Sequence, residues 1–149
     1  MAGVDVLTEI TIDLPVDQVA RYAGDPSNAT EWYENIHRVT WESEPPLRVG
    51  SRVAFAARFL RRDLAYTYEF TELIPGECMV MRTAQGPFPM ETTYTWESIG
   101  TDVTLMRLRN RGEPAGFSRL VAPFVAAAMR RANRKDLAAL KRILESQPR

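Results

Sequence analysis

Hydrophobic and polar residues alternate at the start of the chain. From Val4 to Ile12, every second residue is apolar or a threonine, and most residues between them are polar. A period of two is typical of a β-strand with one buried face. After Pro15, apolar residues recur at helical spacing, and Gly24 can end the helix that they predict. A second short helix is expected to run toward Trp32.

The middle of the chain alternates in the same way over short segments that proline or glycine separates. One separating turn is Pro75-Gly76, where glycine supplies the positive φ that a type II turn requires. Short strands joined by short turns imply antiparallel neighbours. The pattern predicts six further strands: Val39–Glu44, Arg52–Leu60, Leu64–Ile74, Cys78–Thr83, Met90–Trp96 and Val103–Arg109.

The last third of the chain changes to the helical period. Apolar residues recur three or four positions apart from Phe117 to Leu144, and the opposite face carries arginine and lysine. This pattern predicts a long amphipathic helix with one face on a hydrophobic surface. Pro114 is well placed near its start, whereas Pro123 lies within the run and predicts a kink or a break.

Together these elements predict a fold class. Strands grouped apart from the helices indicate an α+β domain, here residues 1–149, with a seven-stranded antiparallel sheet, two short helices after the first strand and a long C-terminal helix. A twisted sheet of this many strands curls. One helix cannot fill the concave side of such a sheet, so we expect a cavity that binds a small molecule.

The composition argues against two classes of partner for this domain, nucleic acids and the membrane interior. Nineteen basic and nineteen acidic residues leave no net charge, whereas a general nucleic-acid binder needs excess positive charge. No stretch reaches the roughly 18 consecutive apolar residues of a spanning helix, so stable membrane insertion is not expected. A single cysteine, Cys78, fits a reducing compartment, and we expect the protein to be cytoplasmic.

Few residues are candidates for chemistry. One histidine and one cysteine, His37 and Cys78, cannot build a metal site rich in these ligands. The sequence has neither a Gly-x-Ser-x-Gly turn for a nucleophile nor a glycine-rich phosphate loop. We therefore expect no metal and no cofactor, and we assign no catalytic residue. His37 stays an alternative general base, although a lone histidine is more often an ordinary surface residue.

Aromatic residues that share one face of a strand are the candidates for ligand binding. A buried tyrosine hydroxyl needs a partner, which is protein, water or ligand, so core packing is the alternative. Arg82 is expected on the outer face unless it points inward to bind an anionic head group or an enolate. The residues predicted to bind ligand are Trp32, Phe55, Phe59, Tyr66, Tyr68, Phe70, Arg82, Tyr94, Trp96, Phe124 and Ala128.

Five segments, in this order, resemble one superfamily. They are Leu14–Val19 after the first strand, the region of Trp32, the turn Ile74-Pro75-Gly76, the stretch Tyr94–Glu97 and the segment Arg109–Pro114. The chain resembles the START-like or SRPBCC group, which includes polyketide cyclases/dehydrases and lipid-transport proteins. The resemblance implies a helix-grip fold with a hydrophobic cavity under the long helix. It does not imply catalysis, because one scaffold holds many functions.

Three functions follow from these observations. The first is binding, as a carrier or sensor, of a hydrophobic or amphipathic small molecule such as a lipid or polyketide. The second is a polyketide aromatase/cyclase that folds its substrate and stabilises an enolate. The third is an interaction module whose basic helix docks an acidic partner. A homodimer is an alternative to the monomer in each.

Overall fold

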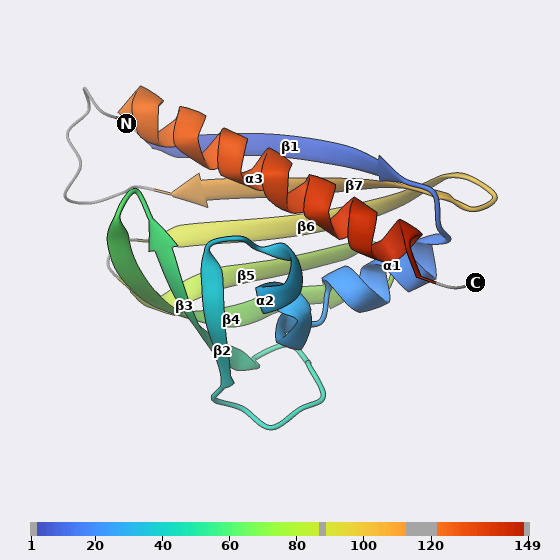
Figure 1. Ribbon diagram of the computed structural model, residues 1–149. Helices are drawn as coiled ribbons and strands as arrows, with labels where there is room; N and C mark the ends of the chain where they lie inside the picture. Colours follow the sequence, from blue (N-terminus) through green and yellow to red (C-terminus); the bar gives the residue numbers. More distant parts are fainter. Residues whose placement is uncertain (1–2, 87–88, 113–121, 148–149) are drawn as a thin grey trace.

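The structure is a computed structural model that describes residues 3–86, 89–112 and 122–147 (Figure 1). Its seven strands form one antiparallel sheet in the order β1-β7-β6-β5-β4-β3-β2. The predicted α+β helix-grip fold is therefore confirmed. In chain order the elements are β1 (Val4–Ile12), α1 (Val16–Ala23), the short 3-10 helix η1 (Pro26–Asn28), α2 (Ala29–Trp32), β2 (Ile36–Trp41), β3 (Arg52–Phe59), β4 (Arg62–Ile74), β5 (Cys78–Gln85), β6 (Met90–Gly100), β7 (Val103–Gly112) and α3 (Ala122–Glu145).

The sheet is an antiparallel meander whose last strand pairs with the first strand of the chain. Strands β2 to β7 each pair with the next along the chain, and β1 then pairs with β7, so that β1 and β2 form the two edges. The helices α1, η1 and α2 connect these edges. Figure 1 shows the sheet curving around α3, which crosses its concave side, while α1 and α2 lie near one end of that helix.

The register settles which face of each strand is inward. In β5, Met79 and Met81 are buried, and in β7 Met106 and Leu108 are fully buried. Apolar residues occur on both faces of these two strands, so alternation in the sequence does not show which face is inward. Strand β2 runs from Ile36 to Trp41, three residues earlier than predicted, because Ile36 already pairs with β3.

Helix α3 is held most firmly over its C-terminal half. Leu137, Leu140 and Leu144 are each at most 1% exposed and belong to the main core. The ammonium group of Lys141 donates to the carbonyl oxygen of Thr11 at 2.7 Å. This half of α3 is therefore fixed to the end of β1.

Pro123 is the second residue of the range over which α3 is described, Ala122–Glu145. From Pro123 to Glu145 the helix is continuous. The expected start near Pro114, together with Phe117, lies outside the described residues. No helix in the described ranges is long and apolar enough to span a membrane.

Candidate functional site

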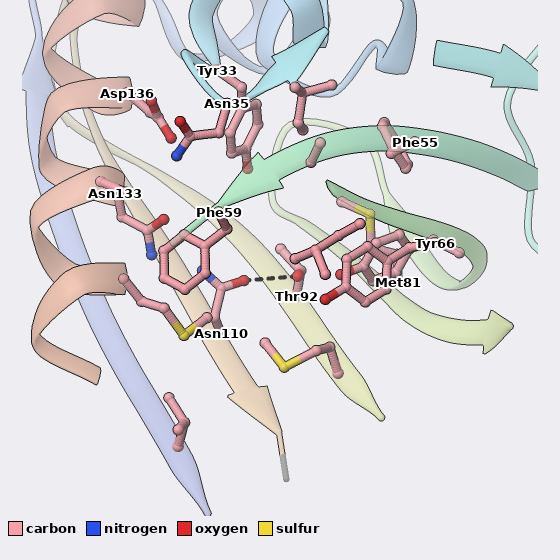
Figure 2. Close-up of a pocket in the computed structure, with 18 of the residues that line it drawn as sticks. Tyr33, Asn35, Phe55, Phe59, Tyr66, Met81, Thr92, Asn110, Asn133 and Asp136 are labelled. Carbon is pink, nitrogen blue, oxygen red and sulfur yellow. Dashed lines mark hydrogen bonds between the residues drawn. The ribbon is translucent and has the colours of Figure 1, made fainter. Parts of the chain in front are cut away.

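A cavity of about 170 Å³ lies between the sheet and the N-terminal half of α3 (Figure 2). Three sets of elements form its walls: α3 from Val125 to Asp136, the inward faces of β1 and of β3 to β7, and the segment from Tyr33 to Ile36 at the start of β2. Its lining residues are Val4, Tyr33, Asn35, Ile36, Phe55, Ala57, Phe59, Leu64, Tyr66, Tyr68, Met81, Met90, Thr92, Tyr94, Asn110, Val125, Met129, Ala132, Asn133 and Asp136.

The wall formed by β3 to β6 is mostly hydrocarbon, sulfur and aromatic rings. Phe55 pairs with Tyr66 across β3 and β4, and their side chains face the same way because paired residues share a face. Figure 2 shows Phe55, Tyr66 and Met81 grouped on one side of the cavity. This wall can bind an apolar body by burying it from water.

The wall formed by α3 carries two polar residues, Asn133 and Asp136, beside apolar ones, and is called the polar wall here. Asn133 and Asp136 stand three residues apart, so both lie on the same helix face. Asn133 is 6% exposed and Asp136 is 3% exposed. The side-chain amide nitrogen of Asn133 is buried and has no hydrogen-bond partner. In Figure 2 both side chains project from α3 toward the cavity.

Asp136 is a buried carboxyl with one fixed partner. The backbone N–H of Glu34 donates to its Oδ1 at 3.0 Å. Burial raises the pKa of Asp136 to about 6, and the nearby Glu34 side chain adds to the rise. The hydrogen bond from the backbone and the charge of Lys135 oppose it. The carboxyl group of Asp136 is therefore mostly ionised at pH 7. That pH is still close enough to its pKa for the group to take up and release a proton.

Two tyrosines close the cavity beside Asp136. The hydroxyl groups of Tyr33 and Tyr94 share a hydrogen bond of 2.5 Å. Burial raises the pKa of each phenol well above its ordinary value, so both are neutral at physiological pH. Trp32 supports the pair, with its ring centroid 4.1 Å from that of Tyr33 and 5.9 Å from that of Tyr94.

Thr92 and Asn110 form a polar pair on the cavity floor. Thr92 on β6 donates from its hydroxyl to Oδ1 of Asn110 on β7 at 2.8 Å. Burial raises the pKa of the neighbouring Tyr68 to about 12, although an interaction with Thr92 lowers it in part. These groups differ from Asn133, whose amide nitrogen is left unpaired.

Comparison with known proteins identifies the family. The model of the family described as "Polyketide cyclase / dehydrase and lipid transport" matches residues 3–145. The chain belongs to this family. The predicted START-like superfamily is thereby confirmed, and the family implies a domain that binds a hydrophobic ligand. No curated protein matches the chain in sequence.

Solved structures similar to this family member share its fold at low identity. The Zhui aromatase/cyclase from Streptomyces is 15% identical with a TM-score of 0.81, and the match covers 96% of this chain and 94% of that chain. A START superfamily protein from Mycobacterium smegmatis is 14% identical with a TM-score of 0.80, covering 95% and 97%. Major latex-like protein 151 from Panax ginseng is 12% identical with a TM-score of 0.72, covering 98% and 97%.

Five of the residues predicted to bind ligand line the cavity of this family member: Phe55, Phe59, Tyr66, Tyr68 and Tyr94. The other six do not. Trp32 and Phe70 are buried in the core, and Ala128 is a partly buried residue of α3. Phe124 is 74% exposed in the first turn of α3. Trp96 is buried beside a second hollow, described below.

Arg82 is a correction to the predicted ligand set. It alternates with the inward Met81 on β5, so its side chain lies on the outer face of the sheet and is 67% exposed. There its Nε donates to Oε2 of Glu91 at 2.6 Å. Arg82 therefore cannot bind an anionic group or an enolate in the cavity.

The polar wall was not predicted from the sequence, because neither Asn133 nor Asp136 was among the candidate residues. The signal was present in the spacing, because Val125, Met129, Asn133 and Asp136 follow one another at three or four residues. Two polar residues on the apolar face of an amphipathic helix indicate a buried polar site.

A second hollow of about 560 Å³ lies outside the helix grip. It is formed by α1, the segment Pro45–Leu47 and the turn between β4 and β5. The half-buried Cys78 lies on its wall, and burial raises the pKa of the thiol, with Glu72 and Glu77 adding to the rise. A raised pKa makes a thiol less reactive at neutral pH.

Neither hollow offers a metal site. Within the described ranges, no three histidine, cysteine, aspartate or glutamate side chains come close enough together to hold a metal ion. The chemistry available in the cavity is therefore that of a carboxylate, an amide, neutral phenols and an apolar wall.

Proposed function

We propose that the protein binds a small amphipathic molecule in the cavity between the sheet and α3, as a carrier or sensor. The observation that carries this proposal is the unpartnered amide nitrogen of Asn133, buried beside the carboxyl of Asp136 in a mostly apolar cavity. The ligand's hydrocarbon part lies against Phe55, Tyr66 and Met81. Its polar part lies under α3.

The energetics support a ligand at this place. A buried donor without a partner costs about 1–3 kcal/mol, and a buried carboxylate costs more unless it is compensated. A molecule whose polar group can both accept and donate a hydrogen bond compensates both residues on binding. Its apolar part adds about 25 cal/mol for each Å² removed from water. The site is thus destabilised when empty and relieved when filled.

The volume limits the part of the ligand that is enclosed. An apolar cavity of about 150 Å³ is enough to hold benzene, and this cavity measures about 170 Å³. It encloses a group of about one aromatic ring. A longer lipid or polyketide would place its head in the cavity and extend the rest beyond it.

Native mass spectrometry of protein purified without detergent tests this proposal. We expect a retained molecule, or a rise in melting temperature when one-ring alcohols and hydrocarbons are added. A ligand at 100 times its Kd stabilises the fold by about 2.7 kcal/mol. A polypeptide mass alone, with no thermal shift for any of these compounds, contradicts the proposal.

A second candidate function is an aromatase/cyclase activity, and Asp136 is the observation that favours it. A carboxyl group with a pKa of about 6 in a cavity suits general acid–base catalysis near neutral pH. The carboxylate would take a proton from carbon next to a ketone, and the amide of Asn133 would donate to the enolate oxygen. The enolate carbon would then attack a second carbonyl, and the new alkoxide would take the proton back from Asp136.

Proton exchange tests the first step of this reaction. In D₂O, phenylacetone should exchange its α-hydrogens faster with the protein than in buffer alone, as followed by NMR. The rate should rise with pH around an apparent pKa of about 6, because the carboxylate is the active form. Asp136→Asn should abolish the acceleration. An exchange rate equal to that of buffer contradicts this second function.

A further inference from the structure

The polar wall also determines which polar group a ligand can carry. We infer that the cavity selects a neutral hydroxyl compound, a phenol or an alcohol, over a carboxylate, an ether or an amine of the same shape. This inference rests on the proposed binding function and names the ligand class of that same site. It follows from the hydrogen-bond inventory of Asn133 and Asp136 and from the charges around them.

The two residues offer complementary hydrogen bonds. Nδ2 of Asn133 is a donor that lacks an acceptor. Asp136, when ionised, can only accept, and the Glu34 N–H occupies part of that capacity at Oδ1. A hydroxyl oxygen accepts from Asn133 while its hydrogen is donated to Asp136. One group therefore satisfies both residues.

Other polar groups satisfy at most one of the two. A carboxylate or an ether oxygen accepts from Asn133 but has no hydrogen to donate to Asp136. An ammonium group donates to Asp136 but leaves Asn133 without an acceptor, and moving its charge and its other N–H groups out of water costs several kcal/mol. Among uncharged groups the bond to Asp136 should dominate the choice, because hydrogen bonds to a charged partner are the strong ones.

Charge strengthens the selection against anions. Of the described residues that line the cavity, none is basic, and Asp136 carries the negative charge. The titratable groups that face Asp136 from the elements packed against it are Glu34 and the neutral phenols of Tyr33 and Tyr94, and the uncharged side chain of Asn35 lies beside it (Figure 2). Lys135 lies on the exposed face of α3. An anionic ligand would thus meet an acidic wall in a medium of low dielectric constant, where repulsion is strong.

Five compounds that share a p-tolyl body separate these requirements. They are p-cresol, 4-methylanisole, 4-methylbenzoate, 4-methylbenzylamine and toluene, and each has a body of the size that the cavity encloses. Binding at pH 7.5 is measured by NMR, with the side-chain amide resonances of Asn133 as the local reporter. We expect p-cresol to bind about tenfold more tightly than 4-methylanisole or toluene, because it alone makes the bond to Asp136.

Two variants make the test specific. In Asp136→Asn, the amide oxygen can keep the bond from Glu34 while the charge is lost. That variant should lose most of the preference for p-cresol and bind 4-methylbenzoate more tightly than the original protein does. Asp63→Asn is the matched control, because Asp63 is 79% exposed on the β3–β4 hairpin, far along the chain from α3. It should leave every preference unchanged.

The outcomes separate this inference from the function on which it rests. If toluene and p-cresol bind equally, or if 4-methylbenzoate or 4-methylbenzylamine binds best, the selection is wrong while the binding function stands. If none of the five compounds shifts the Asn133 resonances, both the function and the inference are overturned. If p-cresol binds best and Asp136→Asn removes its advantage, both are supported.

Discussion

Tyr33 and Tyr94, 61 residues apart in the chain, meet hydroxyl to hydroxyl at 2.5 Å on the wall of the cavity. Tyr33 follows α2 and Tyr94 belongs to β6, so this bond ties the segment before the edge strand β2 to the middle of the sheet. Both phenols are buried and neutral. The bond therefore stabilises the wall that faces Asp136.

Loss of one hydroxyl should leave the other without its partner. We predict that Tyr94→Phe lowers the free energy of unfolding by about 1–3 kcal/mol, the cost of a buried unsatisfied hydroxyl. The double variant Tyr33→Phe/Tyr94→Phe should cost less than the sum of the two single changes. Urea denaturation measures both. Tyr22→Phe is the control, since Tyr22 bonds to Glu31 in an exposed pair; additive single effects contradict the prediction.

The buried carboxyl of Asp136 should make stability fall as pH rises. Its pKa is about 6 in the folded protein against 3.8 for an ordinary aspartate, so between these values the folded state holds a proton that the unfolded state has lost. Stability then decreases with pH across this window, and the full penalty is present above pH 7. It is at most about 3 kcal/mol.

Asp136→Asn should remove this dependence. The variant should match the original protein near pH 3.5 and become more stable than it as pH rises through 6, in denaturation curves measured at fixed ionic strength. Because Asn keeps an oxygen for the Glu34 N–H, the comparison isolates the charge. A stability difference that does not vary with pH would show that Asp136 has an ordinary pKa.

Filling the cavity should block binding without unfolding the protein. Ala132 lines the cavity on α3, so Ala132→Leu adds three carbon atoms to the space that a ligand would occupy. We predict that p-cresol no longer raises the melting temperature of this variant. Ala138→Leu, on the exposed face of the same helix, should retain the shift. Equal shifts in the two variants would place the ligand elsewhere, for example in the second hollow beside Cys78.

The C-terminal half of α3 should contribute most of the helix's stabilising contacts. Leu140 is fully buried in the main core, and we predict that Leu140→Ala costs about 2–5 kcal/mol, because truncation leaves a cavity. Leu7→Ala should cost less than about 1 kcal/mol, since Leu7 is 54% exposed on the outer face of β1. Thermal and urea unfolding distinguish the two.

Alternation and helical spacing were sufficient to predict the fold. The predicted strand Val4–Ile12 pairs with β7 along its whole length. Leu137 and Leu140 lie on the buried face of the predicted helix. The ends of elements were less predictable. Strand β2 begins at Ile36 because of its pairing with β3, and pairing is not visible in one segment alone.

The candidate site was only half predictable. Parity on a strand identified Tyr66, Tyr68 and Tyr94, because residues two apart share a face. Trp96 shares that parity but lies beyond the cavity, since parity gives a direction and not a position along the strand. Charge favoured the outer face for Arg82, where its side chain lies, but the general rule that charged residues are exposed gives no indication that Asp136 is buried.

The unequal anchoring of α3 has a consequence for the exchange of ligands. Leu140 belongs to the main core and Lys141 bonds to β1, whereas Val125 and Met129, over the cavity, belong to a smaller cluster with Val4 and Val6. A ligand can then enter when the turns of α3 over the cavity open locally, at a free-energy cost below that of global unfolding. The dissociation rate of a ligand and the free energy of unfolding of the protein can therefore change independently of one another.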